Sequence, residues 1–127
     1  MKLQSDLSRV LGLGSARAGT HHWWHQRLSA IALIPLALWF VTALLTHMHD
    51  DVVDLTNWIR SPFVTVLLVA MIGAMFYHAK LGLQVVIEDY VHADIAKVAL
   101  LIAMKLGCAL GGLLGIVSVL KISFGMT

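Results

Sequence analysis

Three long apolar runs constrain the fold of this chain more than any other feature. They cover about residues 28–46, 61–87 and 95–120, and an α-helix needs about 20 mainly apolar residues to cross a bilayer. Hydrophobic residues make up 59% of the 127 residues and charged residues only 13%, a composition unlike that of a soluble globular domain. We therefore predict an all-α membrane protein, a single domain over residues 1–127 with three transmembrane helices.

The charges that flank the first run predict the orientation of this bundle. The segment before it contains Lys2, Arg9 and Arg17, with Arg27 at the start of the run, whereas the loop after it carries one arginine against three aspartates. Because cytoplasmic flanks carry the excess of basic residues, we expect a cytoplasmic N-terminus. The small net charge of +2 does not point to nucleic acid.

The N-terminal segment does not have the pattern of a secretory signal peptide. The first apolar run begins only near Leu28, and no small-residue cleavage site follows it. A mitochondrial transit peptide remains an alternative, because the first 20 residues hold two arginines and three serines, although Asp6 is also there. We expect an uncleaved, multi-pass protein of a bacterial cytoplasmic membrane, with a short amphipathic surface helix over Ser5–Leu13.

Several histidines lie close to the ends of the first run. They are His21, His22, His25, His47 and His49. Clustered histidines, and the nearby Asp50 and Asp51, are possible metal ligands. However, Trp23 and Trp24 mark a membrane–water interface, where histidines need no metal. We interpret both clusters as interfacial or solvated segments, with metal binding as the alternative.

His78 is the histidine that lies deep within an apolar run. An ionisable side chain there is costly to bury, so it is a functional hypothesis by default. Gly82 is one turn further along the same helix face, where a missing side chain leaves room for a flat ligand or another helix. Asp89 returns to that face about 16 Å along the axis, with Tyr90 beside it. The pattern predicts a deep histidine below an acid–phenol pair at the membrane surface.

These residue types suit two kinds of ligand. A lone histidine beside an open face is suited to axial ligation of haem iron, with the second ligand from another subunit; the alternative is a histidine hydrogen-bonded to a neighbouring helix. Arg27 is either a snorkelling anchor or a partner for haem propionates. The Tyr90 hydroxyl can donate to a quinone carbonyl, and Asp89 can orient it. We expect the His21–Arg27 segment and the Asp89–Tyr90 pair on the cytoplasmic side, as one site with His78.

Small residues and a lone cysteine complete the pattern. Gly107, Gly111 and Gly115 recur at every fourth position of the third run, which predicts close contact with another helix of this chain or of a partner. Cys108 is the only cysteine, so an internal disulfide and a multi-cysteine metal site are excluded.

The second run resembles that of the small hydrophobic anchor subunit, the D subunit, of succinate dehydrogenase, complex II. His78 is followed by Asp89-Tyr90 at the end of the second of three spans, and His21-x5-Arg27-x-Ser29-Ala30 is similar to the segment before the family's first span. The resemblance covers most of residues 21–92. It implies a bundle like those of the fumarate reductase and succinate dehydrogenase anchors.

The resemblance also implies a function. His78 would be an axial ligand of haem b, whose other ligand comes from a cytochrome b556-type C subunit, and Arg27 would lie near the propionates. Tyr90 would hydrogen-bond ubiquinone, with Asp89 supporting that site. A flavoprotein subunit would oxidise succinate and an iron–sulfur subunit would carry the electrons, linking the tricarboxylic acid cycle to the respiratory chain. This chain would be a non-catalytic anchor among membrane lipids.

Three other functions compete with this one. A small homo-oligomeric transporter usually has an acid deep within a span, whereas the Asp and Glu residues here lie near the ends of runs or between them. The anchor of a related fumarate reductase, or another di-haem cytochrome b, would have more histidines at depth. In a purely structural membrane protein, His78 would only pack.

Overall fold

The computed structural model describes residues 17–126, with side chains from residue 20 onward. This part of the chain forms four helices and no strand: α2 (Arg17–His47), α3 (Val52–Arg60), α4 (Pro62–Tyr90) and α5 (Asp94–Ser123). The surface helix expected over Ser5–Leu13 lies outside the described residues.

Three of these helices are long and apolar enough to cross a membrane. The candidate spans are Thr20–His47, Pro62–Tyr90 and Asp94–Ser123. The prediction of an all-α protein with three transmembrane helices is therefore confirmed. The orientation of the N-terminus stays a prediction.

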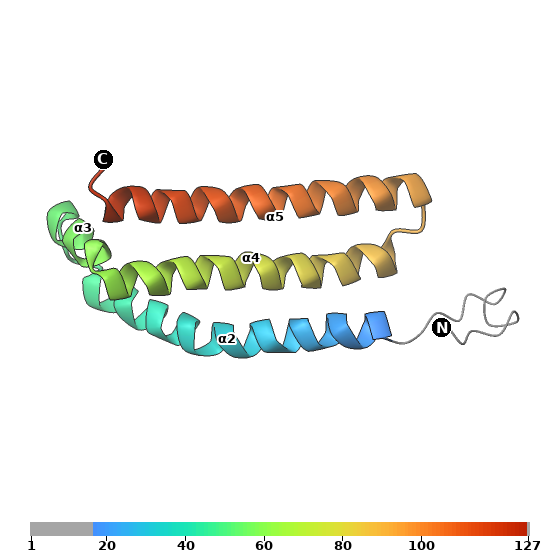
Figure 1. Cartoon of the computed structure of the whole chain (residues 1–127), viewed down its shortest axis with the longest axis horizontal. Coiled ribbons are helices and arrows are strands. Elements are labelled where there is room, and N and C mark those ends of the chain that lie inside the picture. The colour runs from blue at the N-terminus through green and yellow to red at the C-terminus, as the bar shows by residue number, and fades with distance from the viewer. Residues whose placement is uncertain (1–16, 127) are drawn as a thin grey trace, which may run out of the picture.

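Local sequence signals set the ends of the helices. Pro62 opens α4, where its missing N–H costs no hydrogen bond, and Asp94 places a carboxylate in the first turn of α5. After α5 the chain leaves through Gly125 with a φ of 69°, a conformation that glycine adopts without strain. Pro35 lies inside α2, which curves along its length (Figure 1).

The three long helices lie side by side with α4 in the middle (Figure 1). α4 packs against both α2 and α5, and successive long helices run in opposite directions. The start of α2, the end of α4 and the start of α5 therefore lie together, at what we call the Tyr90 end of the bundle. The short helix α3 lies at the opposite end and packs against α4 and α5.

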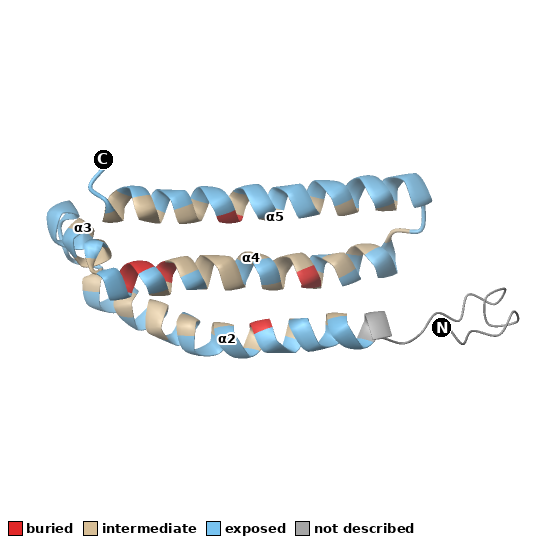
Figure 2. Ribbon diagram, in the orientation of Figure 1, coloured by how far each residue is buried: buried red, intermediate tan, exposed pale blue. Residues whose placement is uncertain are grey.

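This arrangement buries few side chains (Figure 2). The buried residues in the described part of the chain are Ser29, Val64, Thr65, Leu68, Leu81 and Gly112. Large apolar side chains on the outer helices are exposed, for example Leu38 at 66% and Leu114 at 69%. Such a surface suits lipid or neighbouring membrane helices, and contacts within the bundle depend on packing and hydrogen bonds.

Glycines bring α5 close to α4. A Cβ atom added at Gly111 would lie 2.7 Å from Cε1 of Phe76, and one at Gly115 would lie 3.1 Å from Cγ2 of Ile72. The predicted contact surface is therefore present at these two positions, and its partner is α4 of the same chain. Gly107, which we also expected in the contact, has no atom within 4 Å of an added Cβ. It lies beyond the reach of Phe76.

Helix α3 was not predicted, because the sequence analysis expected a solvated connection after His47. The Asp51 carboxylate caps its start by accepting from the Asp54 N–H at 2.8 Å. Trp58 then stacks against Trp39 with ring centroids 6.2 Å apart, and His47 lies 4.5 Å from Trp58. Val52, Leu55, Trp58 and Ile59 recur at helical spacing, so the sequence did hold a signal for this short amphipathic helix.

Substitution of Gly111 by Leu should destabilise the bundle. The new side chain would overlap the Phe76 ring, and overpacking of a close contact typically costs about 1–3 kcal/mol. Gly107→Leu is the matched control, since it makes the same gain in helix propensity in open space. We expect a lower melting temperature in detergent for Gly111→Leu than for Gly107→Leu. Equal melting temperatures would show that the glycine contact does not limit stability.

Candidate functional site

His78 lies half-buried where α4 meets α2, and both of its ring nitrogens face polar atoms of α2. Its Nδ1 is 3.0 Å from Oγ of Ser29, and its Nε2 is 3.5 Å from Nε2 of Gln26. The Ser29 hydroxyl also donates to the carbonyl oxygen of Gln26 at 3.0 Å. The deep histidine is thus hydrogen-bonded to a neighbouring helix, as one of the two alternatives for His78 expected.

The spacing of residues on each helix explains why these groups meet. His22, Gln26 and Ser29 follow one another by four and three residues and so share one face of α2. His78 and Gly82 lie one turn apart on the facing side of α4. A Cβ atom added at Gly82 would lie 3.5 Å from Nε2 of Gln26, so this glycine admits the amide beside His78.

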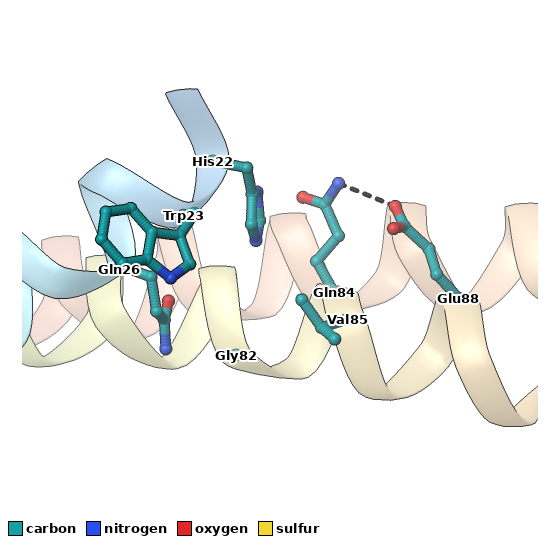
Figure 3. A pocket seen from close by; sticks show the side chains of 7 residues that line it. All are labelled: His22, Trp23, Gln26, Gly82, Gln84, Val85 and Glu88. Atoms are coloured by element: carbon teal, nitrogen blue, oxygen red, sulfur yellow. Dashed lines mark hydrogen bonds between the residues drawn. The ribbon is translucent and has the colours of Figure 1, made fainter. Parts of the chain in front are cut away.

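A cavity of about 670 Å³ opens between α2 and α4, on the side of His78 toward the Tyr90 end (Figure 3). It is lined by His22, Trp23, Gln26, Gly82, Gln84, Val85 and Glu88. The Gln84 amide donates to the Glu88 carboxylate at 2.8 Å on its outer side. Volumes of this size are typical of small-molecule sites.

Two buried polar atoms beside this cavity lack a hydrogen-bond partner in the described part of the chain. They are Nε2 of His22 and Oε1 of Gln26, and both side chains extend from α2 toward α4 (Figure 3). Buried polar groups are nearly always paired, so unpaired ones indicate an absent water or ligand. The cavity can therefore accept a ligand with polar groups of its own.

The other predicted site residues lie at the Tyr90 end but do not contact His78. Arg27 is exposed and its guanidinium lies over the Trp23 ring, 5.3 Å from the centroid. Asp89 is exposed, and Tyr90, the last residue of α4, is 78% exposed. Within residues 20–126, no hydrogen bond or ion pair joins these three residues to one another.

The histidines at the start of α2 form ring contacts instead of a metal site. His21 stacks on His25 at 6.1 Å, and His25 meets the edge of Tyr77 on α4 at 6.2 Å. The Nζ of Lys80 lies over the ring of Tyr77, 4.8 Å from its centroid. The described residues hold no group of three or more His, Cys, Asp or Glu side chains that can bind a metal ion.

The residues around His78 fit a flat, partly polar cofactor such as haem. The imidazole is a suitable axial ligand, Gly82 leaves the backbone open beside it, and the adjoining cavity has two unpaired polar atoms. The Gln26 amide would have to move to admit the haem iron, because its nitrogen lies 3.5 Å from Nε2 of His78, the ring nitrogen that does not contact Ser29. A contact of that length is a weak hydrogen bond, so its displacement costs little.

Comparison with known proteins identifies the family. The family model for the succinate dehydrogenase/fumarate reductase transmembrane subunit matches residues 1–114. The chain belongs to this family. It is 35% identical over 103 residues to the succinate dehydrogenase hydrophobic membrane anchor subunit of Rickettsia bellii, covering 81% of this chain and 82% of the relative.

More distant relatives carry similar names. The succinate dehydrogenase membrane anchor subunit of Reclinomonas americana is 32% identical, with 71% of this chain and 78% of the relative covered. The hydrophobic membrane anchor subunit of Paracoccus denitrificans is 28% identical, with 77% and 76% covered. No solved structure matches the chain. The predictions of this family and of a multi-pass bacterial membrane protein are confirmed, and the chain is a membrane anchor subunit of the succinate dehydrogenase type.

Gln26 was not predicted as a neighbour of His78, and no separate role was predicted for Ser29. The available signal was the polar stripe of His22, Gln26 and Ser29 at helical spacing on one face of α2, which continues polar character to the start of the apolar run. Three polar residues at helical spacing at the start of a span indicate a face that meets another helix.

Proposed function

We propose that this chain is the D-type anchor of succinate:ubiquinone oxidoreductase. In this proposal it joins a flavoprotein, an iron–sulfur subunit and a cytochrome b556-type C subunit, helps to bind haem b, and forms one wall of the ubiquinone site. The observation that carries it is the position of His78, held by α2 beside a cavity at the end of the bundle where Tyr90 lies. Family membership supplies the context.

For haem b, His78 would provide one axial nitrogen and Arg27 would meet a propionate. Haem b, when bound, supplies a one-electron carrier close to the quinone. The part of this chain is to hold the imidazole between two helices and to provide polar side chains at the rim. The exposure of Arg27 at the Tyr90 end supports this role. Among the described residues, its guanidinium has a ring contact with Trp23. The second axial ligand would come from the C subunit.

For ubiquinone, Tyr90 would donate its hydroxyl to a carbonyl oxygen and Asp89 would support that arrangement. Both side chains are exposed at the end of α4. A pocket cannot be built from one exposed helix end, so the proposal places the remaining walls on other subunits. The quinone would take two electrons and two protons there, and the electrons would come from succinate oxidation in the flavoprotein.

The proposed orientation and assembly follow from charge and exposure. With the N-terminus in the cytoplasm, the Tyr90 end would face the soluble subunits and α3 would face the other side of the membrane. The exposed apolar faces of α2 and α5 would contact lipid and the C subunit.

Affinity purification tests the assembly directly. We expect a tagged copy of this chain, extracted in mild detergent, to bring with it a flavoprotein, an iron–sulfur protein and a second small membrane protein in equal amounts. Mass spectrometry identifies them. Recovery of the chain alone, or as a homo-oligomer, would contradict the proposal and favour the transporter.

Substitution of His78 by Leu should remove haem from the purified complex. Leu cannot ligate iron, and its isobutyl group can occupy much of the space of the imidazole. The haem-to-flavin ratio measures the loss. His49→Leu, which changes an exposed histidine near the α3 end, should leave the ratio unchanged. Full haem content in the His78→Leu complex would refute ligation by this residue.

Substitution of Tyr90 by Phe should weaken the quinone reaction selectively. Loss of one hydrogen bond worth about 0.5–1.5 kcal/mol lowers kcat/KM for ubiquinone about two- to tenfold. Succinate oxidation with a soluble acceptor that takes electrons from the flavoprotein should not change. Tyr77→Phe is the control, because it also removes a phenol hydroxyl from α4 but lies beside His25. Equal effects of the two substitutions would argue against a quinone contact at Tyr90.

A further inference from the structure

We propose that Ser29 is a positioning residue that fixes the tautomer of His78, so that the lone pair of the imidazole lies on Nε2, the nitrogen that faces the cavity-lining Gln26. The inference rests on the proposed role of His78 as a haem ligand and deepens it. Ser29 lies in the first span, and without this role its burial would be explained by packing alone.

The Ser29 hydroxyl has one proton, and the geometry shows where that proton is used. Oγ lies 3.0 Å from the carbonyl oxygen of Gln26, which can only accept a hydrogen bond. Back-bonding of a serine to a carbonyl one turn earlier is a common arrangement within helices. With its proton directed to Gln26, Oγ presents lone pairs to Nδ1 of His78 at 3.0 Å. Nδ1 must therefore carry the imidazole proton and donate it to Ser29.

The contact on the other ring nitrogen agrees with this assignment. A neutral imidazole has a single N–H, so a proton on Nδ1 leaves Nε2 as an acceptor. The group that faces Nε2 is the amide nitrogen of Gln26, which can only donate, at 3.5 Å. With the Gln26 amide in this orientation, its contact agrees with the tautomer that the Ser29 contact indicates.

The strength of the two contacts decides which nitrogen is available to a ligand. The Ser29 contact is short and shielded, because Ser29 is only 8% exposed, and the chain from His78 through Ser29 to the Gln26 carbonyl is cooperative. The Gln26 contact is long and borders the cavity. A ligand therefore displaces Gln26 from Nε2 and leaves Ser29 on Nδ1. A hydrogen bond of this kind fixes ring orientation and raises the basicity of the ligating nitrogen.

The test uses the complete detergent-purified complex, with Ser29 replaced by Ala or by Thr. Loss of a partner to the non-ligating nitrogen typically costs about 10–100-fold in affinity, so we expect haem to transfer to an excess of a haem-binding acceptor protein at least about tenfold faster from Ser29→Ala. The haem midpoint potential should rise, because a less basic imidazole stabilises ferric iron less. Ser29→Thr keeps a hydroxyl that can bond the same carbonyl and should restore both values.

The control for packing is Thr65→Ala. Thr65 is equally buried, at 8% exposed, but its hydroxyl bonds Ser123 and backbone carbonyls at the α3 end. It should lower stability without changing haem transfer or potential. If Ser29→Ala also left the potential and the transfer rate unchanged, the inference would be overturned.

The His78→Leu complex separates this failure from failure of the proposed function. Haem lost from His78→Leu but unaffected by Ser29→Ala would leave the haem ligand in place and refute only the role of Ser29. Haem retained in His78→Leu, or absent from the unsubstituted complex, would refute both. A Ser29→Thr complex that behaved like Ser29→Ala would also overturn the inference, because the hydroxyl would then not be the group that matters.

Discussion

The structure depends on the hydrogen bonds that hold His78 within a span. Lipid offers no water to an imidazole, so its polar nitrogens must find partners on a neighbouring helix. Ser29 and Gln26 provide them from α2. Because apolar side chains gain little by leaving lipid for one another, this polar contact and the close fit of small residues set the positions of the three helices.

The two interfaces of α4 differ in chemistry: the contact with α5 is apolar and close-packed, and the contact with α2 is polar. Against α5, Gly111 and Gly115 let Phe76 and Ile72 lie directly on the helix surface, which makes a close apolar contact. Against α2, polar side chains meet across Gly82 and enclose a cavity with unpaired atoms. A close-packed interface can only support the bundle. The interface with α2 holds a long hydrogen bond that a ligand could replace, which supports the proposed site there.

The sequence predicted what depends on composition and periodicity, and missed what depends on particular pairs. Three apolar runs and a deep His78 are visible without coordinates, and so is the glycine spacing of α5. Which glycines meet α4 depends on how the two helices pack, so Gly111 and Gly115 contact Phe76 and Ile72 and Gly107 has no such contact within this chain. Ser29 was quoted only as part of a motif, since its importance comes from His78, 49 residues away. The short helix α3 has apolar residues at helical spacing (Val52, Leu55, Trp58 and Ile59), but this signal lies in a nine-residue segment between two long apolar runs and was overlooked.

The site in this chain is incomplete in a way that its chemistry explains. His78 offers one nitrogen, Tyr90 is 78% exposed, and Arg27 is exposed and contacts the Trp23 ring within the described part of the chain. Each of these three side chains is attached to a helix of the bundle and has a side that a partner or ligand could approach. The Gln26 amide lies 3.5 Å from Nε2 of His78, so it offers this nitrogen a weak hydrogen bond in the single chain. A stronger ligand could replace that weak bond. Such a balance is what the proposed binding of a cofactor at His78 would require.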